Sequence, residues 1–342
     1  MAKKYLPEYT ITDNLLSIIS EAEKLRTWLR TSRIDIPWLE KIRFEALTRR
    51  AHFSTSIEGN PLTLPEVEAL ARGEDIPAAK KAKQEVVNYF AALRWIQEQR
   101  PDKVVTEKGL LNLHRLLTKN VLPQSHAGKY KTRQNYVVAA GRVIYTPPEP
   151  KEAKTLTIAL LGWLENFGKS VHPIIAQAIA HYELVRIHPF IDGNGRCARC
   201  LATWILYLRS FDTEHIFAVD EFYREDHEGY YQSIQQVTGE DGDLTSWLEY
   251  CSLAIRDTLE RTQRRIKELS IPVKLRKVTL TRQQESLLLA FRDKNRLSVS
   301  EMVKILGVKR ARLYRIIKPL VEAKIIEPSR TTPVVYSLWE KH

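Results

Sequence analysis

The stretch RIHPFIDGNGRCAR, Arg186–Arg199, separates two apolar segments that both have the periodicity of helices. The stretch itself is poorly suited to continue either helix, because Pro189, Gly193 and Gly195 each disfavour a helix interior. His188, whose side chain suits proton transfer, stands where the first segment ends. We therefore expect a helix, a loop that carries the chemistry, and a second helix.

Glycine and arginine side by side predict an anion site at the start of the second helix. Gly193, Asn194 and Gly195 let the backbone approach a ligand, and the first amides of a helix have no partners within it. Arg196 and Arg199 are three residues apart, so they share a face of the first turn. Guanidinium groups there would bind phosphate oxygens, often two at a time.

Two more residues extend this phosphate site toward catalysis. Asp192 places a carboxylate beside the expected phosphates, where a Mg²⁺ ion bound to both needs little else. His188 is the residue best suited to accept a proton near neutral pH. The stretch therefore predicts a phosphate-transfer site. Cys197 and Cys200 form C-x-x-C with no second pair or nearby histidine, so we interpret them as small helix residues rather than zinc ligands.

Residues 188–199, HPFIDGNGRCAR, resemble the signature HxFx(D/E)GNGRxxR of Fic-domain proteins at every diagnostic position. The resemblance covers roughly Thr63–Leu253. It implies a helical core fold and the transfer of AMP from ATP to a Tyr, Thr or Ser hydroxyl of a target protein. The Gly-Asn-Gly sequence favours AMP transfer, because the branch of the family that phosphorylates its targets has Ala-Asn-Lys there.

The resemblance also implies a role for each residue. His188 would be the general base and Asp192 the Mg²⁺ ligand, while Arg196 and Arg199 would hold the β- and γ-phosphate. Tyr230 and Tyr231 match aromatic residues near the nucleoside, although they are equally well explained as core tyrosines. The implied ATP-binding set is Val143, Ile144, Tyr145, Gly193, Asn194, Gly195, Arg196, Cys197, Ala198, Arg199, Tyr230 and Tyr231.

A second motif, STSIEGN at Ser54–Asn60, is similar to the inhibitory motif (S/T)xxxE(G/N) of the same family. Ser54, Glu58 and Gly59 occupy its fixed positions. The resemblance implies that Glu58 pairs with Arg199 and takes the place of the γ-phosphate contact, which would make the resting enzyme slow. A helix that simply ends at Gly59 explains the same residues, and both interpretations can hold together.

The segment Gly128–Pro150 breaks the helical pattern. Two runs rich in β-branched and aromatic residues flank Ala139–Arg142, which predicts a β-hairpin. A lone hairpin is marginally stable, and exposed connections often carry function. The resemblance implies that this flap binds the target chain by strand addition.

The chain has 342 residues, which corresponds to about two domains. We expect a mainly α fold with a helical Fic core, the β-hairpin flap and a C-terminal winged-helix domain. The expected divisions are an N-terminal helical region over 1–110 with the inhibitory motif at 54–60, the Fic core over 111–255, a linker helix over 256–276 and the winged helix over 277–342.

The C-terminal segment carries most of the positive charge. Residues 272–342 hold 16 Lys+Arg against 6 Asp+Glu, which gives +10 of the +12 of the chain. Ser298 and Glu301 form a candidate capping box, and the order helix, glycine turn, helix and hairpin resembles a winged helix. Pro319 predicts a kink or an early end of the second helix. Its basic residues, which point to DNA as an anionic partner, are Arg310, Arg312, Arg315 and Lys318.

Other sequence features concern the cellular location of the protein and the alternatives for its function. No apolar run is long enough to cross a membrane, and MAKKYLPEYTITDN has no apolar signal core, so we expect a cytoplasmic protein without membrane contact. Three cysteines suggest reduced thiols. The sequence leaves open a nucleotide-binding transcriptional regulator, removal of AMP by water that Glu58 orients, and a homodimer. It does not identify the target protein.

Overall fold

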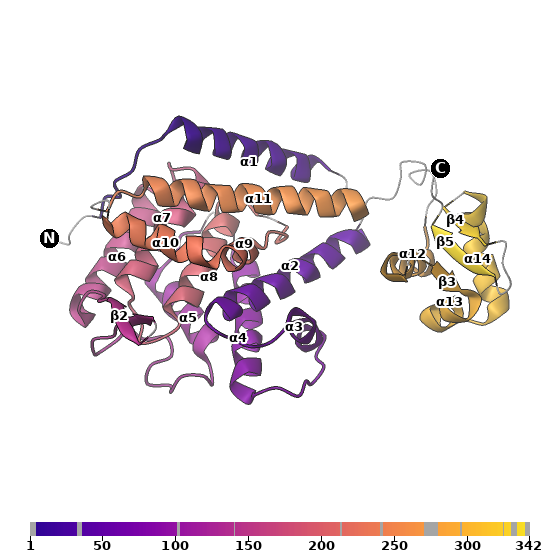
Figure 1. The fold of residues 1–342 in the computed structure, drawn as a ribbon, viewed down its shortest axis with the longest axis horizontal. Helices are drawn as coiled ribbons and strands as arrows, with labels where there is room; N and C mark the ends of the chain where they lie inside the picture. The colour runs from indigo at the N-terminus through magenta and orange to yellow at the C-terminus, as the bar shows by residue number, and fades with distance from the viewer. Residues whose placement is uncertain are drawn as a thin grey trace. The chain divides into compact units, whose positions relative to one another are not determined.

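The computed structural model is mainly helical, as predicted, and divides into two compact units, Met1–Ile266 and Lys267–His342 (Figure 1). The two units are described separately. The structure describes residues 5–32, 36–100, 103–139, 141–212, 214–239, 242–269, 280–294, 296–323, 325–329 and 334–338. Within these ranges, no helix is both long and apolar enough to span a bilayer.

The N-terminal unit is a helical bundle that is built around α7 and α8. Twelve of the fifteen residues of α7 are buried, which identifies it as a central helix that is covered on nearly every side. The helices are α1 (Asp13–Thr31), α2 (Ile36–Ile57), α3 (Leu64–Ala71), α4 (Lys80–Gln97), α5 (Glu107–Thr118), α6 (Pro150–Asn166), α7 (Pro173–Ile187), α8 (Asn194–Leu208), α9 (Val219–Glu225), α10 (His227–Gly239) and α11 (Thr245–Leu269).

Helix α8 lies at the centre of the contacts that matter for the site. It packs most extensively against α7 and also contacts α2, α4 and α5. Helices α1 and α11 run side by side across one face of the unit (Figure 1), where Arg256 donates to Glu21 at 3.1 Å. The first turn of α8 is therefore surrounded by packed helices that can supply side chains to it.

The predicted hairpin is present. Strands β1 (Val137–Ala139) and β2 (Arg142–Tyr145) pair antiparallel, with Gly141 at a φ of +74° in the turn between them. A positive φ is readily adopted by glycine, which explains why a glycine stands at this position.

The predicted linker helix is not a separate element in the structure. Arg256–Leu269 continue α11 without a break, and Leu259 and Ile266 are buried. The apolar face of α11 extends past residue 255, so the same helix continues. Residues 270–276 lie outside the described part of the chain.

The C-terminal unit has its own core and a three-stranded antiparallel sheet of order β3-β5-β4. The two predicted strands are present as β4 and β5, and β3 is an additional strand that the sequence analysis missed. The elements are α12 (Arg282–Lys294), β3 (Arg296–Ser298), α13 (Val299–Leu306), α14 (Arg310–Glu322), β4 (Ile326–Pro328) and β5 (Val335–Leu338).

The local signals of this unit are confirmed with one exception. The capping box of α13 is formed, since the Ser298 amide donates to Glu301 at 2.9 Å and the Glu301 amide donates to Ser298 at 3.3 Å. Of the two outcomes predicted for Pro319, the early end of α14 is wrong, because the helix continues to Glu322. Leu320, which follows the proline, is fully buried, and its packing offsets the cost of the missing amide donor.

Candidate phosphate-transfer site

The signature stretch forms the predicted break between two helices. Helix α7 ends at Ile187, and His188 follows in the left-handed conformation with a φ of 50°. Gly193, at a φ of 79°, is the N-cap of α8, which begins at Asn194. The amides of the first turn of α8 therefore begin directly after the loop, as an anion site requires.

The Asn194 side chain closes this loop on itself. Its Oδ1 accepts from the Phe190 amide and its Nδ2 donates to the Phe190 carbonyl, each at 2.9 Å. The Asn135 Nδ2 donates to the same carbonyl at 2.8 Å. Because the Asn194 side chain is buried and bonded at both ends, only its backbone is available to a phosphate.

His114 of α5 supports the loop from below, and the sequence analysis did not identify it. Its ring stacks on Phe190 with centroids 3.9 Å apart. The Gly128 amide donates to Nδ1 at 3.0 Å, so Nε2 carries the proton that it donates to the Asp192 carbonyl at 2.9 Å. Burial lowers the pKa of His114 to about 4, which keeps the ring neutral. In the sequence, His114 is a single histidine in an amphipathic helix, and this pattern does not indicate that it supports the loop.

His188 has the tautomer that a general base needs. Its Nδ1 lies 3.1 Å from the Val185 carbonyl, an atom that can only accept, so Nδ1 carries the proton. The Nε2 atom therefore keeps its lone pair. Burial, the main cause, lowers the pKa of His188 below the usual histidine value, so the ring is neutral at neutral pH.

The Arg199 guanidinium is held by α2. Arg199 is 3% exposed. Its Nε donates to the Ser54 hydroxyl at 2.7 Å, and its Nη2 donates to the Ser54 carbonyl at 2.9 Å and to Glu58 Oε1 at 2.7 Å. The contact expected between Glu58 and Arg199 is therefore confirmed, and Ser54 adds two bonds of its own.

Glu58 also covers the first turn of α8. A Cβ atom added at Gly195 would collide with Glu58 Oε1, so the carboxylate lies directly over the Gly195 backbone. Helix α2 ends at Ile57, and Gly59 follows at a φ of +85°. The glycine thus ends the helix at the place where Glu58 reaches Arg199, and the two interpretations of this motif are compatible.

A second carboxylate, which was not predicted from the sequence, lies close to Arg199 and offsets its positive charge. Asp220 of α9 places Oδ1 at 3.6 Å from Arg199 Nε and accepts from the Tyr89 hydroxyl at 3.2 Å. Asp220 is 3% exposed, and burial raises its pKa more than the Arg199 charge lowers it. The buried carboxylate is therefore costly in itself, and its value lies in neutralising the guanidinium.

Arg196 has an unused hydrogen-bond donor. Its side chain is buried beside Glu85 of α4 at 3.4 Å and Asp192 at 3.8 Å. Glu85 also accepts from Asn60 at 2.9 Å, so the end of the upstream motif is linked to this arginine. The Arg196 Nε is buried and has no partner among the described residues. An anion at the helix start would supply the missing acceptor.

Asp192 is suited to a cation that arrives with phosphates. Its carboxylate is 55% exposed, and Oδ1 accepts from the Gly193 amide at 2.5 Å. In the described ranges, no group of three or more His, Cys, Asp or Glu side chains is placed to bind a metal. One exposed carboxylate beside a phosphate site fits Mg²⁺, which commonly uses one or two carboxylates together with substrate phosphates.

Four other residues of the implied ATP-binding set have buried or partly buried side chains. The side chains of Cys197 and Ala198 are fully buried in the core, so only their backbone can face a nucleotide. Tyr230 is also a core residue, and its hydroxyl lies 2.9 Å from His181 Nε2. Tyr231 is partly buried and packs edge-on against Tyr230. Of the two interpretations of Tyr230, a residue near the nucleoside or an ordinary core tyrosine, its burial favours the core tyrosine.

The flap is joined to the signature stretch at its base. The Tyr145 hydroxyl donates to the Arg186 carbonyl at 2.9 Å, two residues before His188. Val143 and Ile144 are 57% and 47% exposed. The structure thus anchors Tyr145 near the base and leaves the two apolar residues open to solvent.

The two carboxylates around Arg199 should compensate each other. We expect Asp220→Asn alone to change stability little, because Glu58 still pairs with the guanidinium. In a Glu58→Gly background the same change removes the last carboxylate near Arg199. The double variant should therefore lose more free energy of unfolding than the two single variants together, by about 2 kcal/mol or more. Urea unfolding of the two single variants and the double variant measures this coupling.

Asp192→Asn is the matched control, since Asp192 is exposed and faces Arg196 instead of Arg199. Combined with Glu58→Gly, it should be additive. Additive behaviour of Asp220→Asn as well would mean that the two carboxylates do not share the Arg199 charge.

Comparison with known proteins places the site in a family. Residues 104–206 match the Fic/DOC family. Protein adenylyltransferase Fic of Drosophila willistoni is 33% identical over 172 residues, which cover 49% of this chain and 33% of that protein. The Culex quinquefasciatus protein of the same name is 30% identical over 243 residues, 69% of this chain and 46% of its own. The chain thus spans a third to about half the length of these relatives.

Solved structures agree with this result. A Fic family protein from Desulfovibrio desulfuricans G20 has a TM-score of 0.75 and 26% identity, and the match covers 99% of both chains. Fic-1 from C. elegans has a TM-score of 0.60 and 26% identity, over 75% of this chain and 73% of that one. Residues 104–206 of the protein described here therefore match the Fic/DOC family, and the chain is a distant relative of the protein adenylyltransferases Fic.

Proposed function

We propose that this protein transfers AMP from ATP to a Tyr, Thr or Ser hydroxyl of a target protein, and that Glu58 restrains the reaction. The observation that carries the proposal is the convergence of three groups on one turn. The lone pair of His188, the unused donor of Arg196 and the guanidinium of Arg199 all belong to the stretch that surrounds the Gly193–Gly195 turn.

In this proposal, backbone amides at the start of α8 hold the α- and β-phosphates. Arg196 binds the β-phosphate through its free Nε, and Arg199 binds the γ-phosphate. Mg²⁺, bound by Asp192, would neutralise part of the phosphate charge. Each group acts where negative charge accumulates, and such electrostatic stabilisation is commonly the largest contribution to catalysis.

His188 performs the proton transfer. Its Nε2 accepts the proton of the target hydroxyl while the hydroxyl oxygen attacks the α-phosphorus. The bond between that phosphorus and the oxygen bridging to the β-phosphate breaks, and pyrophosphate leaves. The left-handed backbone at His188 and the Val185 contact fix the ring for this step.

Glu58 would slow this reaction without closing the whole site. Its carboxylate occupies the Arg199 position that the γ-phosphate needs and covers the Gly195 backbone. ATP that binds beside Glu58 is displaced from the geometry of attack. A misplacement of about 1 Å can cost about 10²-fold in rate.

The flap is the proposed docking element for the target. Val138, Val143 and Ile144 are exposed on a two-stranded hairpin whose edges have free backbone groups. A strand of the target added to this edge would run past His188, because Tyr145 ties the base of the hairpin to Arg186.

DNA binding is a second proposed function, and it belongs to the C-terminal unit. We propose that this unit is a winged helix whose recognition helix is α14. Leu313, Ile317 and Leu320 bury one face of α14 in the core of the unit. The opposite face is exposed and basic, with Arg310, Arg312, Arg315 and Lys318. Lys318 has Glu322 at 3.8 Å, and among the described residues none of the three arginines forms an ion pair.

His188→Ala should reduce AMP transfer by about 10²- to 10⁴-fold, because a positioned general base is lost. The measurement is incorporation of labelled AMP from ATP in the Glu58→Gly background, with ATP affinity as the control, since the arginines and the turn remain. Residual activity above about a tenth of the parent rate, with an unchanged circular dichroism spectrum, would refute the base assignment.

Glu58→Gly should raise AMP incorporation into the protein and its targets by about tenfold to 10²-fold, because Arg199 becomes free for the γ-phosphate. Arg199→Ala should be slow with or without Glu58. Glu40→Gly, the same substitution at an exposed site of α2, is the matched control and should leave the rate unchanged. If Glu58→Gly is no faster than Glu40→Gly, the motif only ends a helix.

Alanine at Arg310, Arg312 and Arg315 should weaken binding of the full chain to duplex DNA and reduce its salt dependence by about one unit of slope per lost phosphate contact. Gel shifts over a salt series measure both. Arg282→Ala, at an exposed position of α12, is the control. Absence of binding to any duplex at low salt would make protein docking the better role for α14.

A further inference from the structure

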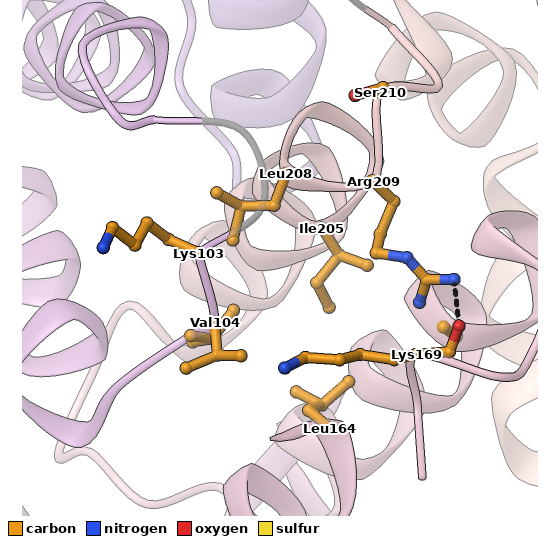
Figure 2. A pocket seen from close by; sticks show the side chains of 10 residues that line it. Lys103, Val104, Leu164, Lys169, Ile205, Leu208, Arg209 and Ser210 are labelled. Carbon is orange, nitrogen blue, oxygen red and sulfur yellow. Dashed lines mark hydrogen bonds between the residues drawn. The ribbon is translucent and has the colours of Figure 1, made fainter. Parts of the chain in front are cut away.

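Figure 2 shows a cavity of the N-terminal unit, which has a volume of about 410 Å³. It is bordered by the C-terminal end of α8, by α6 and α7, and by the segment before α5. Helix α8 begins at Asn194, and Leu208 lies about 20 Å further along the helix at 1.5 Å per residue. The cavity is therefore separate from the proposed ATP site.

The floor of the cavity is apolar and its rim is cationic. Leu164, Ile205 and Leu208 are buried side chains that line it. Lys103, Lys169 and Arg209 also line it, and no Asp or Glu is among its described lining residues. Figure 2 shows the Lys169 side chain extended across the cavity, with its ammonium group above Leu164.

The Arg209 charge is fixed at the wall but is not neutralised. Its guanidinium donates to the backbone carbonyls of Gly168, of Lys169 at 2.7 Å and of Val171 at 3.0 Å. In the described ranges, none of the three cations at the rim has a carboxylate within ion-pair distance. Burial lowers the pKa of Arg209, which is the direction expected for a desolvated cation without a counter-charge.

From this combination we propose that the cavity is a binding site for a small amphipathic anion, a carboxylate with an alkyl chain. The chain would cover Leu164, Ile205 and Leu208, and the carboxylate would lie between Lys169 and Arg209. The volume is within the range of roughly 300–1,000 Å³ that is usual for small-molecule sites. A free phosphate fits less well, because it would leave the apolar floor exposed to water.

Octanoate titrated into the full-length protein tests this proposal by calorimetry. We expect a Kd on the order of 0.1–1 mM, which is typical of a ligand with so few atoms. Acetate should not bind, because it lacks the chain, and octylamine should not bind, because it carries the same charge as the rim. His188→Ala should bind octanoate as the parent does, so the result is independent of the proposed AMP transfer.

Lys169→Glu should weaken octanoate binding by about tenfold or more, because it replaces an attraction by a repulsion. Lys151→Glu, an exposed lysine at the other end of α6, is the matched control and should have no effect. The proposal is overturned if octanoate does not bind at about 10 mM, ten times the weakest Kd expected. It is equally overturned if octylamine binds as well as octanoate, or if Lys169→Glu binds as tightly as the parent.

Discussion

One buried positive charge, the guanidinium of Arg199, organises the N-terminal unit of this protein. An uncompensated charge in the interior costs several kcal/mol, so helices that approach it must supply acceptors. Helix α2 supplies Ser54, the residue that follows its end supplies the Glu58 carboxylate, and α9 supplies Asp220. Tyr89 of α4 donates to Asp220 and completes the set. Four helices that are distant in sequence therefore meet at one side chain at the start of α8.

This arrangement would allow the proposed restraint by Glu58 to coexist with a stable site. Two carboxylates face one arginine, so Arg199 would keep Asp220 if Glu58 moved aside or gave way to the proposed phosphate. Asp220 lies deep in the unit, whereas the Glu58 side chain is 34% exposed. The exposed partner can thus be exchanged for a ligand while the buried partner holds the guanidinium in place.

The turn itself is built to present backbone atoms. Asn194 uses its side chain to close the loop, His114 supports Phe190 and Asp192 from below, and Cys197 directs its side chain into the core. Contacts to the proposed phosphates would therefore be left to amides and to the two arginines. The same helix ends about 20 Å away at the cationic cavity, so α8 connects the two anion sites that we propose.

The sequence alone determined the features that depend on neighbours a few residues apart. The break at His188–Gly193, the hairpin at Gly141 and the Ser298 capping box follow from local conformational preferences, and the structure contains all three. The Glu58–Arg199 contact was also predicted, but from the family resemblance. Asp220, Glu85 and His114 became visible only in the tertiary structure, because a helical pattern shows which face is buried and not which distant side chain meets it. Packing likewise decided that α14 continues past Pro319 and that α11 continues past residue 255.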